Sequence, residues 1–340
     1  MDKIQRLHEI LTISRRVVIV THTKPDADAL GSSLGLWGFL TQTGHSCTVI
    51  TPSDYPGFLR WMPGSKAVHV VNRNQPDSQI RAEQLIGEAE IIFCLDFSNL
   101  KRIEALEQPV RNAGAIKVMV DHHLEPESFS DFDFWDVTSA STASLVLKLI
   151  EDLSGKEYIG KDIANCLYAG LMTDTGGFRH SNTGAHEFNV AARLIQYGAE
   201  PSKVASSVYD SNSLNRLQLT GYVLCNKLTV LPEFHTAYMC ITRSELDRFK
   251  AQTGDTEGLV NYGLSIEGVK LAVLMHDRDG EVKMSLRSTG AFSVNEMSRK
   301  HFKGGGHRNA AGGTSAESLE DTLKKLISIL PEYRDELNKD

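Results

Sequence analysis

The chain has 340 residues, of which 41% are hydrophobic and 27 are glycine, and this length is enough for about two domains with separate cores. No apolar run approaches the roughly 20 residues that a membrane span needs, and charges interrupt the N-terminal segment, so we expect a cytoplasmic protein with no membrane partner. A formal net charge of -7 argues against long nucleic acid as a partner, but leaves room for a small anionic substrate that meets a local positive charge.

The first half of the chain alternates apolar runs with helical patterns. This alternation is typical of a mostly parallel sheet covered by helices on both faces. The apolar runs predict strands at 15–20, 46–50, 90–96 and 115–121. The amphipathic stretches predict helices at 29–44, 141–153, 162–173 and 185–197. We therefore expect an N-terminal doubly wound α/β domain over residues 1–200.

The second half has a different character. Residues 201–228 are helical and more polar, and we expect a helical connector there. Beyond the connector we expect a smaller α/β domain over residues 229–340, with a cleft between the two domains. Its strands are predicted within 227–242, 268–277 and 280–288, with a D-R-D-G hairpin turn joining the last two, and its helices near 292–301 and 316–330.

Acidic residues and histidines follow the predicted strands of the first domain. Because the carboxyl ends of parallel strands meet at one edge of a sheet, we expect these side chains to converge on one site. A further aspartate, Asp174, follows the predicted helix at 162–173. The full set is His22, Asp26, Asp28, Asp96, Asp121, His122, His123 and Asp174.

This set of side chains indicates metal-assisted phosphoester hydrolysis. Carboxylate and imidazole ligands without thiolates favour Mn²⁺, Mg²⁺ or a similar divalent ion over a structural zinc. Several carboxylates together suggest two ions. Two ions about 3.5–4 Å apart lower the pKa of a bridging water and neutralise a phosphoryl group under attack.

Simpler explanations exist for each residue taken alone. An aspartate after a strand is usually a turn or a helix cap, and adjacent histidines are often a polar surface pair. Their joint occurrence at successive strand ends is much harder to explain by capping. Gly31, Gly35 and Gly38 do not fit the G-x-G-x-x-G pattern of a dinucleotide site, and we expect them to allow close packing of their helix on the sheet.

The second domain carries a glycine-rich segment, Gly304-Gly305-Gly306-His307. Consecutive glycines let backbone N–H groups approach an anion, and a helix beginning near Arg308 would direct its positive end at the same point. We therefore expect this segment to hold a phosphate, with a flexible hinge as the alternative.

Four further residues are candidates for substrate contacts. An arginine can bind a phosphate with two parallel hydrogen bonds, although a surface salt bridge is the alternative. Two candidates end the strand at 280–288, and two lie just beyond Asp174. They are Arg287, Ser288, Arg179 and His180.

The spacing His22-x3-Asp26-x-Asp28, followed by Asp96, Asp121-His122-His123 and Asp174, resembles the DHH phosphoesterase superfamily. The segment 302–313 resembles the glycine-rich signature of the C-terminal domain that accompanies DHH domains. The resemblance spans nearly the whole chain, and alanine at position 27, where many members have glycine, leaves every ligand type intact. Within the superfamily the chain is most similar to the oligoribonuclease and 3'-phosphoadenosine-5'-phosphate (PAP) phosphatase group.

The resemblance implies two divalent ions, most readily Mn²⁺, with Mg²⁺ or Co²⁺ as alternatives. It implies that Asp96 bridges the ions, that His123 lies beside the scissile phosphate and that Asp121 orients the histidines. The remaining ligands divide between the ions, His22 and Asp26 on one and Asp28, His122 and Asp174 on the other.

We therefore expect a metal-dependent hydrolase that cleaves short 5'-phosphorylated oligoribonucleotides to mononucleotides and converts PAP to AMP. The first alternative is a phosphodiesterase for cyclic dinucleotides or their linear products. Exopolyphosphatase or pyrophosphatase activity, a RecJ-type exonuclease and a non-catalytic nucleotide sensor follow. The sequence leaves the oligomeric state open, with a homodimer among the alternatives.

Overall fold

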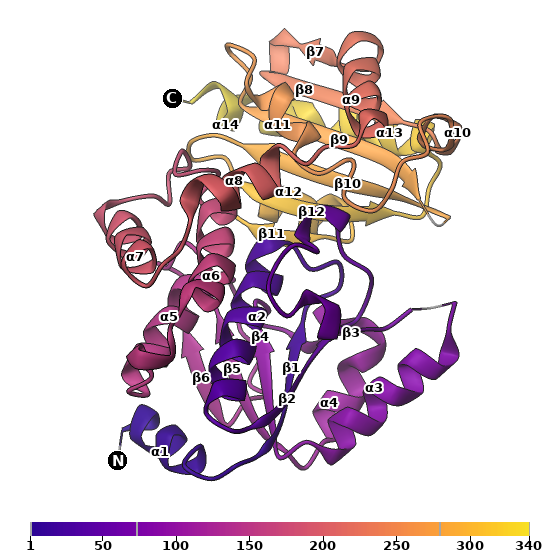
Figure 1. Ribbon diagram of the computed structural model, residues 1–340. Helices are drawn as coiled ribbons and strands as arrows, with labels where there is room; N and C mark the ends of the chain where they lie inside the picture. Colours follow the sequence, from indigo (N-terminus) through magenta and orange to yellow (C-terminus); the bar gives the residue numbers. More distant parts are fainter. Residues whose placement is uncertain (1, 73, 279, 340) are drawn as a thin grey trace. The chain divides into compact units, whose positions relative to one another are not determined.

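The computed structural model describes residues 2–72, 74–278 and 280–339 (Figure 1). The chain forms two compact units, Met1–Ser211 and Asn212–Asp340. The expected connector, 201–228, contains helices α8 (Pro201–Tyr209) and α9 (Leu214–Asn226), one in each unit. Among the described residues, no helix is both long enough and apolar enough to cross a membrane.

The first unit is built on a six-stranded sheet in which all neighbouring strands are parallel. The strand order is β3-β2-β1-β4-β5-β6. The order reverses between β1 and β4, and open α/β sheets bind ligands at the carboxyl edge of such a switch point. The predicted doubly wound architecture is confirmed. The strands are β1 (Arg16–Thr21), β2 (Ser46–Thr51), β3 (His69–Val70), β4 (Ile91–Leu95), β5 (Ile116–Asp121) and β6 (Phe132–Trp135).

The central strands form because runs of β-branched residues are buried on both faces of the sheet. In β1, Val17 and Ile19 pack into one hydrophobic core, while Val18 and Val20 pack into another on the opposite face. The first core includes residues of α2, α5 and α6, and the second includes residues of α3 and α4 (Figure 1). The helices of this unit are α1 (Lys3–Ile10), α2 (Ala27–Gln42), α3 (Pro76–Glu88), α4 (Glu107–Asn112), α5 (Thr142–Asp152), α6 (Lys161–Asp174), α7 (Ala185–Gln196) and α8.

The glycines of α2 pack against a helix, so the prediction that they face the sheet is wrong. A Cβ on Gly31 would lie 2.3 Å from the Cys166 carbonyl oxygen of α6, and a Cβ on Gly35 would lie 2.6 Å from the Leu167 side chain. A Cβ on Gly38 would lie 2.8 Å from Ile163 of the same helix. The glycines therefore bring α2 and α6 close together, and these helices begin and end at the acidic residues of interest.

The second unit contains a mixed six-stranded sheet of order β11-β12-β10-β9-β8-β7; among the described residues β8 and β9 pair in parallel and the other neighbouring strands are antiparallel. The predicted hairpin of β9 and β10 is present, although position 279 of its D-R-D-G turn lies outside the described residues. The strands are β7 (Thr229–Leu231), β8 (Thr236–Ile241), β9 (Leu271–Arg278), β10 (Glu281–Ser288), β11 (Gly305–His307) and β12 (Ala310–Ser315). The helices are α9, α10 (Arg243–Arg248), α11 (Leu259–Leu264), α12 (Val294–His301), α13 (Leu319–Ile329) and α14 (Arg334–Asn338).

The predicted helix near Arg308 is wrong. Gly305–His307 and Ala310–Ser315 form an antiparallel hairpin, and β12 pairs along its length with β10. Small residues favour this arrangement because a Cβ on Gly304 would lie 1.9 Å from Ser298 Oγ and 2.2 Å from the Gly312 carbonyl oxygen. Close packing of the hairpin is therefore one physical reason for the glycines.

Candidate metal centre

The strand register brings the predicted residues to one edge of the first sheet. Thr21, Leu95 and Val120 are aligned across β1, β4 and β5. The next residue of each segment is His22, Asp96 or Asp121, and these three therefore leave the sheet side by side. This is the carboxyl edge at the switch point, where the fold places ligands.

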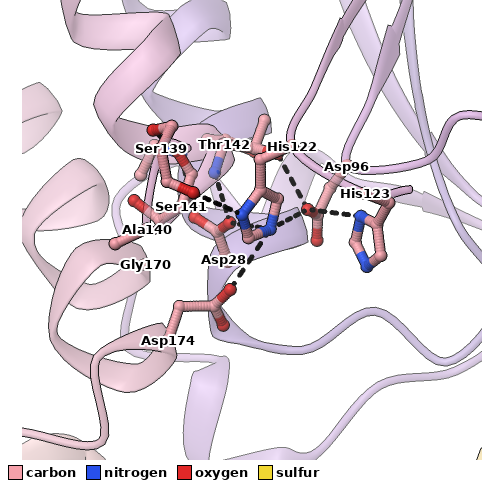
Figure 2. A network of polar contacts seen from close by, with 12 residues as sticks. Asp28, Asp96, His122, His123, Ser139, Ala140, Ser141, Thr142, Gly170 and Asp174 are labelled. Carbon is pink, nitrogen blue, oxygen red and sulfur yellow. Dashed lines mark hydrogen bonds and ion pairs between the residues drawn. The ribbon is translucent and has the colours of Figure 1, made fainter. Parts of the chain in front are cut away.

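Asp96 lies at the centre of the cluster. Its Oδ2 lies 3.4 Å from His22 Nε2. Its Oδ1 lies 3.5 Å from His122 Nε2 and 3.7 Å from His123 Nδ1 (Figure 2). Its backbone φ is +66°, a left-handed conformation that is uncommon for residues other than glycine, although aspartate adopts it more readily than most. The Thr142 hydroxyl donates a 2.8 Å hydrogen bond to Oδ1 and fixes the carboxylate.

Asp28 and Asp174 complete the other side of the cluster. His122 Nε2 lies 3.3 Å from Asp174 Oδ2 and 3.8 Å from Asp28 Oδ2 (Figure 2). The buried Asp28 carboxylate accepts hydrogen bonds from the backbone N–H groups of Thr142 at 2.6 Å and Ala143 at 2.9 Å. These groups belong to the first turn of α5, whose positive end stabilises the buried anion.

Asp26 has a structural role as well as a place in the cluster. Its Oδ1 caps α2 by accepting hydrogen bonds from the backbone N–H groups of Asp28 and Ala29, each at 3.0 Å. The possible ligand atoms of His22, Asp26 and Asp96 nevertheless lie within 4.8 Å of one another. The same distance limit holds for Asp28, Asp96 and His122. The cap and the ligand role are therefore compatible.

Backbone carbonyl groups fix the orientation of two histidines. Nδ1 of His22 lies 2.9 Å from the Thr23 carbonyl oxygen, and Nδ1 of His122 lies 3.1 Å from the Ser139 carbonyl oxygen. Because a carbonyl only accepts, we assign the proton to Nδ1 in both rings, which directs the Nε2 lone pair of the neutral imidazole at the carboxylates. Acceptors that face each other need a cation or a proton between them. The oxygen and imidazole donors, with carbonyls supporting the rings, fit a divalent metal ion.

The pKa shifts show that the cluster concentrates negative charge. Burial, and then the neighbouring Asp96, raise the pKa of Asp28 well above its ordinary value. Burial also raises the pKa of Asp174 to about 6, although contact with His122 opposes the shift. Burial would raise the pKa of Asp96 too, but positive charge opposite it, carried by protons on His122 and His22 in place of a metal ion, would hold that pKa well below its ordinary value. The site thus favours added positive charge.

Asp121 contacts His123. The Nδ1–H of His123 donates a 2.8 Å hydrogen bond to Asp121 Oδ1. The other carboxylate oxygen of this buried residue has no hydrogen-bond partner in the part of the chain that the structure describes. We expected Asp121 to orient both histidines. Its contact with His123 fits that role, whereas the His122 ring is oriented by the Ser139 carbonyl group.

Sequence reasoning missed Ser139, Thr142 and Gly170. The helix start near 141 was predicted, and the hydroxyl residues of segment 138–144, TSASTAS, favour it, but the pattern did not indicate that these residues contact the metal-centre side chains. Gly170 gave no signal beyond its place in an apolar helix. A Cβ there would lie 2.5 Å from Asp28 Oδ1, so glycine is required for α6 to pass this carboxylate.

Arg179 and His180 lie in a tight loop directly after Asp174. Gly176, Gly177 and Phe178 all have positive φ angles, which turn the chain sharply. Arg179 Nε–H donates a 2.8 Å hydrogen bond to the Gly176 carbonyl oxygen, and His180 Nδ1 lies 3.4 Å from the carbonyl oxygen of Asp174. Both residues are thus adjacent to the metal-centre loop, and their contact with substrate remains a prediction.

The candidates in the second unit lie on and around the paired strands β10, β12 and β11. Arg287 and His307 each pair with Ala310, on opposite sides of β12. The buried Ser288 hydroxyl donates a 2.7 Å hydrogen bond to the Phe292 carbonyl oxygen and accepts one from Asn309 at 2.9 Å. Ser288 therefore holds the neighbouring loop in place, and phosphate binding by Gly304–His307 stays a prediction.

Comparison with known proteins identifies the family. Residues 16–171 match the DHH family N-terminal domain, and residues 234–332 match the DHHA1 domain. A Thermus thermophilus protein named bifunctional oligoribonuclease and PAP phosphatase NrnA is 30% identical over 97% of this chain and 94% of that protein. The chain belongs to the DHH family. The resemblance noted in the motifs is thereby confirmed.

Two further proteins that resemble this chain have names that refer to other substrates. A Listeria monocytogenes protein named cyclic-di-AMP phosphodiesterase PdeA is 27% identical over 97% of this chain but only 49% of that protein. The crystal structure of an exopolyphosphatase-related protein from Bacteroides fragilis has a TM-score of 0.92 and 36% identity, and the match covers 99% of this chain and 98% of that one. The fold is therefore shared with the Bacteroides protein, and the relatives of this chain carry names that refer to different phosphate-containing substrates.

Proposed function

We propose that this DHH family member is a metal-dependent phosphoesterase that hydrolyses short 5'-phosphorylated oligoribonucleotides to mononucleotides and converts PAP to AMP. The observation that carries the proposal is the convergence of His22, Asp28, Asp96, His122 and Asp174 at the switch point, with both Nε2 atoms directed at carboxylates. Such a set suits phosphoester chemistry because it can hold cations against a phosphate.

The metal ligands are assigned by position in the cluster. Asp96 would contact two ions, because its two oxygens face His22 on one side and His122 on the other. Two divalent ions bound there would lower the pKa of a water and neutralise the phosphoryl group. We propose Mn²⁺, with Mg²⁺ or Co²⁺ as alternatives, because carboxylates predominate. The proposed ligands are His22 and Asp26 for one ion, and Asp28, His122 and Asp174 for the other.

Neighbouring groups of the first unit fix the orientation of the proposed ligand side chains. The first turn of α5 holds Asp28, the Ser139 carbonyl group holds His122, and the Thr142 hydroxyl holds Asp96, so little rearrangement is needed when substrate binds. His123, held by Asp121, is proposed to contact the scissile phosphate.

The preference for short substrates is proposed to depend on residues outside the metal centre. We assign recognition of a terminal phosphate to the second unit, where Gly304–His307 and Arg287 flank β12. Arg179 and His180 of the first unit are proposed to contact the nucleotide. A short substrate fits this division because a longer strand would gain few additional contacts, and the chain's net charge of -7 offers little attraction to a polymer.

Cyclic dinucleotides are the second candidate substrates, because of the similarity to PdeA. The first candidate is favoured because the match covers 94% of the Thermus protein but only 49% of PdeA. The deciding experiment compares turnover of a 5'-phosphorylated RNA dinucleotide, PAP, cyclic di-AMP, polyphosphate and long RNA by the Mn²⁺-loaded protein. We expect the dinucleotide and PAP to have the highest kcat/KM. Faster turnover of cyclic di-AMP or polyphosphate would contradict the proposed function and identify that compound as the preferred substrate.

A further inference from the structure

Trp135 ends β6, the edge strand of the first sheet, close to the metal centre. It pairs in register with Asp121, which itself lies one strand away from Asp96. Neighbouring strands are about 4.8 Å apart, so the backbones of Trp135 and Asp96 are separated by two strand spacings, roughly 10 Å. One nucleotide can bridge that separation. Every residue in this comparison belongs to the first unit.

The indole is exposed although its polar atom is anchored. Trp135 is 40% exposed, whereas its Nε1–H donates a 2.7 Å hydrogen bond to the His123 carbonyl oxygen. Trp37 and Trp61 are less exposed. A single exposed hydrophobic residue does not by itself indicate a binding site. Trp135, however, is hydrogen-bonded to the backbone of His123, the residue proposed to contact the scissile phosphate. The hydrogen bond fixes the ring beside the site.

Two more apolar side chains close to Trp135 or His123 in the sequence are also exposed. Leu124 directly follows His123 and is 41% exposed, and Val137 lies two residues beyond Trp135 and is 41% exposed. We call Leu124, Trp135 and Val137 the Trp135 patch. An apolar surface beside a polar, phosphate-binding centre matches the two halves of a nucleotide, because the base has an apolar face and the phosphate is charged.

We propose that Trp135 is a stacking platform for a substrate nucleobase, and that the Trp135 patch thereby contributes selectivity for nucleotides over inorganic phosphate chains. The inference rests on the proposed phosphoesterase function and extends it by naming what binds the base. Base stacking on an aromatic ring is sequence-tolerant because every base offers a π-face. The platform should therefore accept all four bases with modest differences.

Binding can be tested separately from turnover. The full chain is loaded with Mg²⁺, which does not quench fluorescence as paramagnetic Mn²⁺ does, and is titrated with AMP or with ribose 5-phosphate. We expect AMP to quench tryptophan fluorescence, ribose 5-phosphate not to do so, and Trp135→Phe to remove the quench. Equal quenching in Trp135→Phe, or no base-dependent quenching in the wild type, would overturn the platform even if the enzyme turns over RNA.

Kinetics then measure the contribution of the ring. For Trp135→Ala we expect the KM of the 5'-phosphorylated dinucleotide to rise roughly 5- to 150-fold, the equivalent of the ~1–3 kcal/mol of one stacked base, with kcat changed much less. Trp135→Phe should keep most of the affinity. An unchanged KM in Trp135→Ala would refute the proposal, as would an equal loss for a ribose dinucleotide that lacks both bases.

Controls separate stacking from other effects. Ile80→Ala removes a comparably exposed apolar side chain, 52% exposed on α3, and should leave KM unchanged. If Trp135→Ala does not fold, Trp135→Leu keeps an apolar side chain without the ring and should show the same loss. Because edge strands can also pair with a second copy, light scattering is run on each variant. A change from dimer to monomer with unaltered nucleotide affinity would assign the patch to self-association and overturn base stacking.

Discussion

Replacing Gly170 with alanine tests whether the packing of α6 against Asp28 positions the metal centre. The added Cβ would lie 2.5 Å from Asp28 Oδ1 and 2.8 Å from the Ala143 Cβ, whereas ordinary contact begins near 3.4 Å. Either the carboxylate or the helix must therefore shift by about 0.9 Å. A misplacement near 1 Å in a catalytic site costs up to ~10²-fold in rate, so we expect kcat for the 5'-phosphorylated dinucleotide to fall 10- to 100-fold.

Stability should change less than activity in Gly170→Ala. Overpacking costs ~1–3 kcal/mol, but alanine recovers ~1 kcal/mol of helix propensity, which leaves a net loss of about 0–2 kcal/mol. Gly87→Ala on α3 is the matched control, because its Cβ meets nothing within 4 Å, and it should keep full activity. Steady-state kinetics and thermal unfolding of both variants decide the outcome. Gly170→Ala with more than half of the wild-type kcat would refute the role assigned to this contact.

Further variants address the individual site residues. Asp96→Asn should abolish turnover without unfolding the chain, because an amide cannot supply the charge that two ions share; retention of more than about a tenth of kcat, a loss below ~1.4 kcal/mol, would remove the bridging assignment. His22→Ala should weaken Mn²⁺ binding in a calorimetric titration and regain part of its activity at excess Mn²⁺, and an unchanged titration would count against His22 as a ligand. His307→Ala should raise KM for the 5'-phosphorylated dinucleotide with kcat nearly unchanged, and should reduce the preference over a dinucleotide without the 5'-phosphate; a loss in kcat alone would place His307 in the chemical step.

The fold of the first unit was predictable because its strands are long buried runs with clear ends. Val17–Val20 and Ile91–Leu95 are apolar on both faces, and this pattern is typical of parallel strands. The short strands were not predictable. β3 has two residues and β6 has the alternating pattern of an edge, and both form because a neighbouring strand offers a ladder of hydrogen bonds. Tertiary context decides such segments.

The error at Arg308 has the same origin. Glycine-rich sequence before a small-residue run is compatible with a loop that starts a helix, and the local sequence contains nothing that forbids it. Gly305 and Gly306 instead pair with residues of β12, and β12 pairs with β10. The partner strand ends at Ser288, well before the hairpin in the sequence. A local pattern could not reveal that pairing, because the energy comes from a strand that is distant along the chain.

In the candidate site, the charged side chains were predictable from the sequence, but the groups that hold them were not. Residues that carry charge, such as Asp28 and His122, are visible because aspartates and histidines recur just beyond successive buried strands. The groups that hold them are the backbone N–H of Thr142 and the carbonyl of Ser139, which every sequence contains. These groups act only because α5 begins opposite the sheet edge. The geometry of a metal centre therefore depends on backbone atoms that no residue pattern can identify, and a substitution such as Gly170→Ala can damage the centre without replacing a ligand.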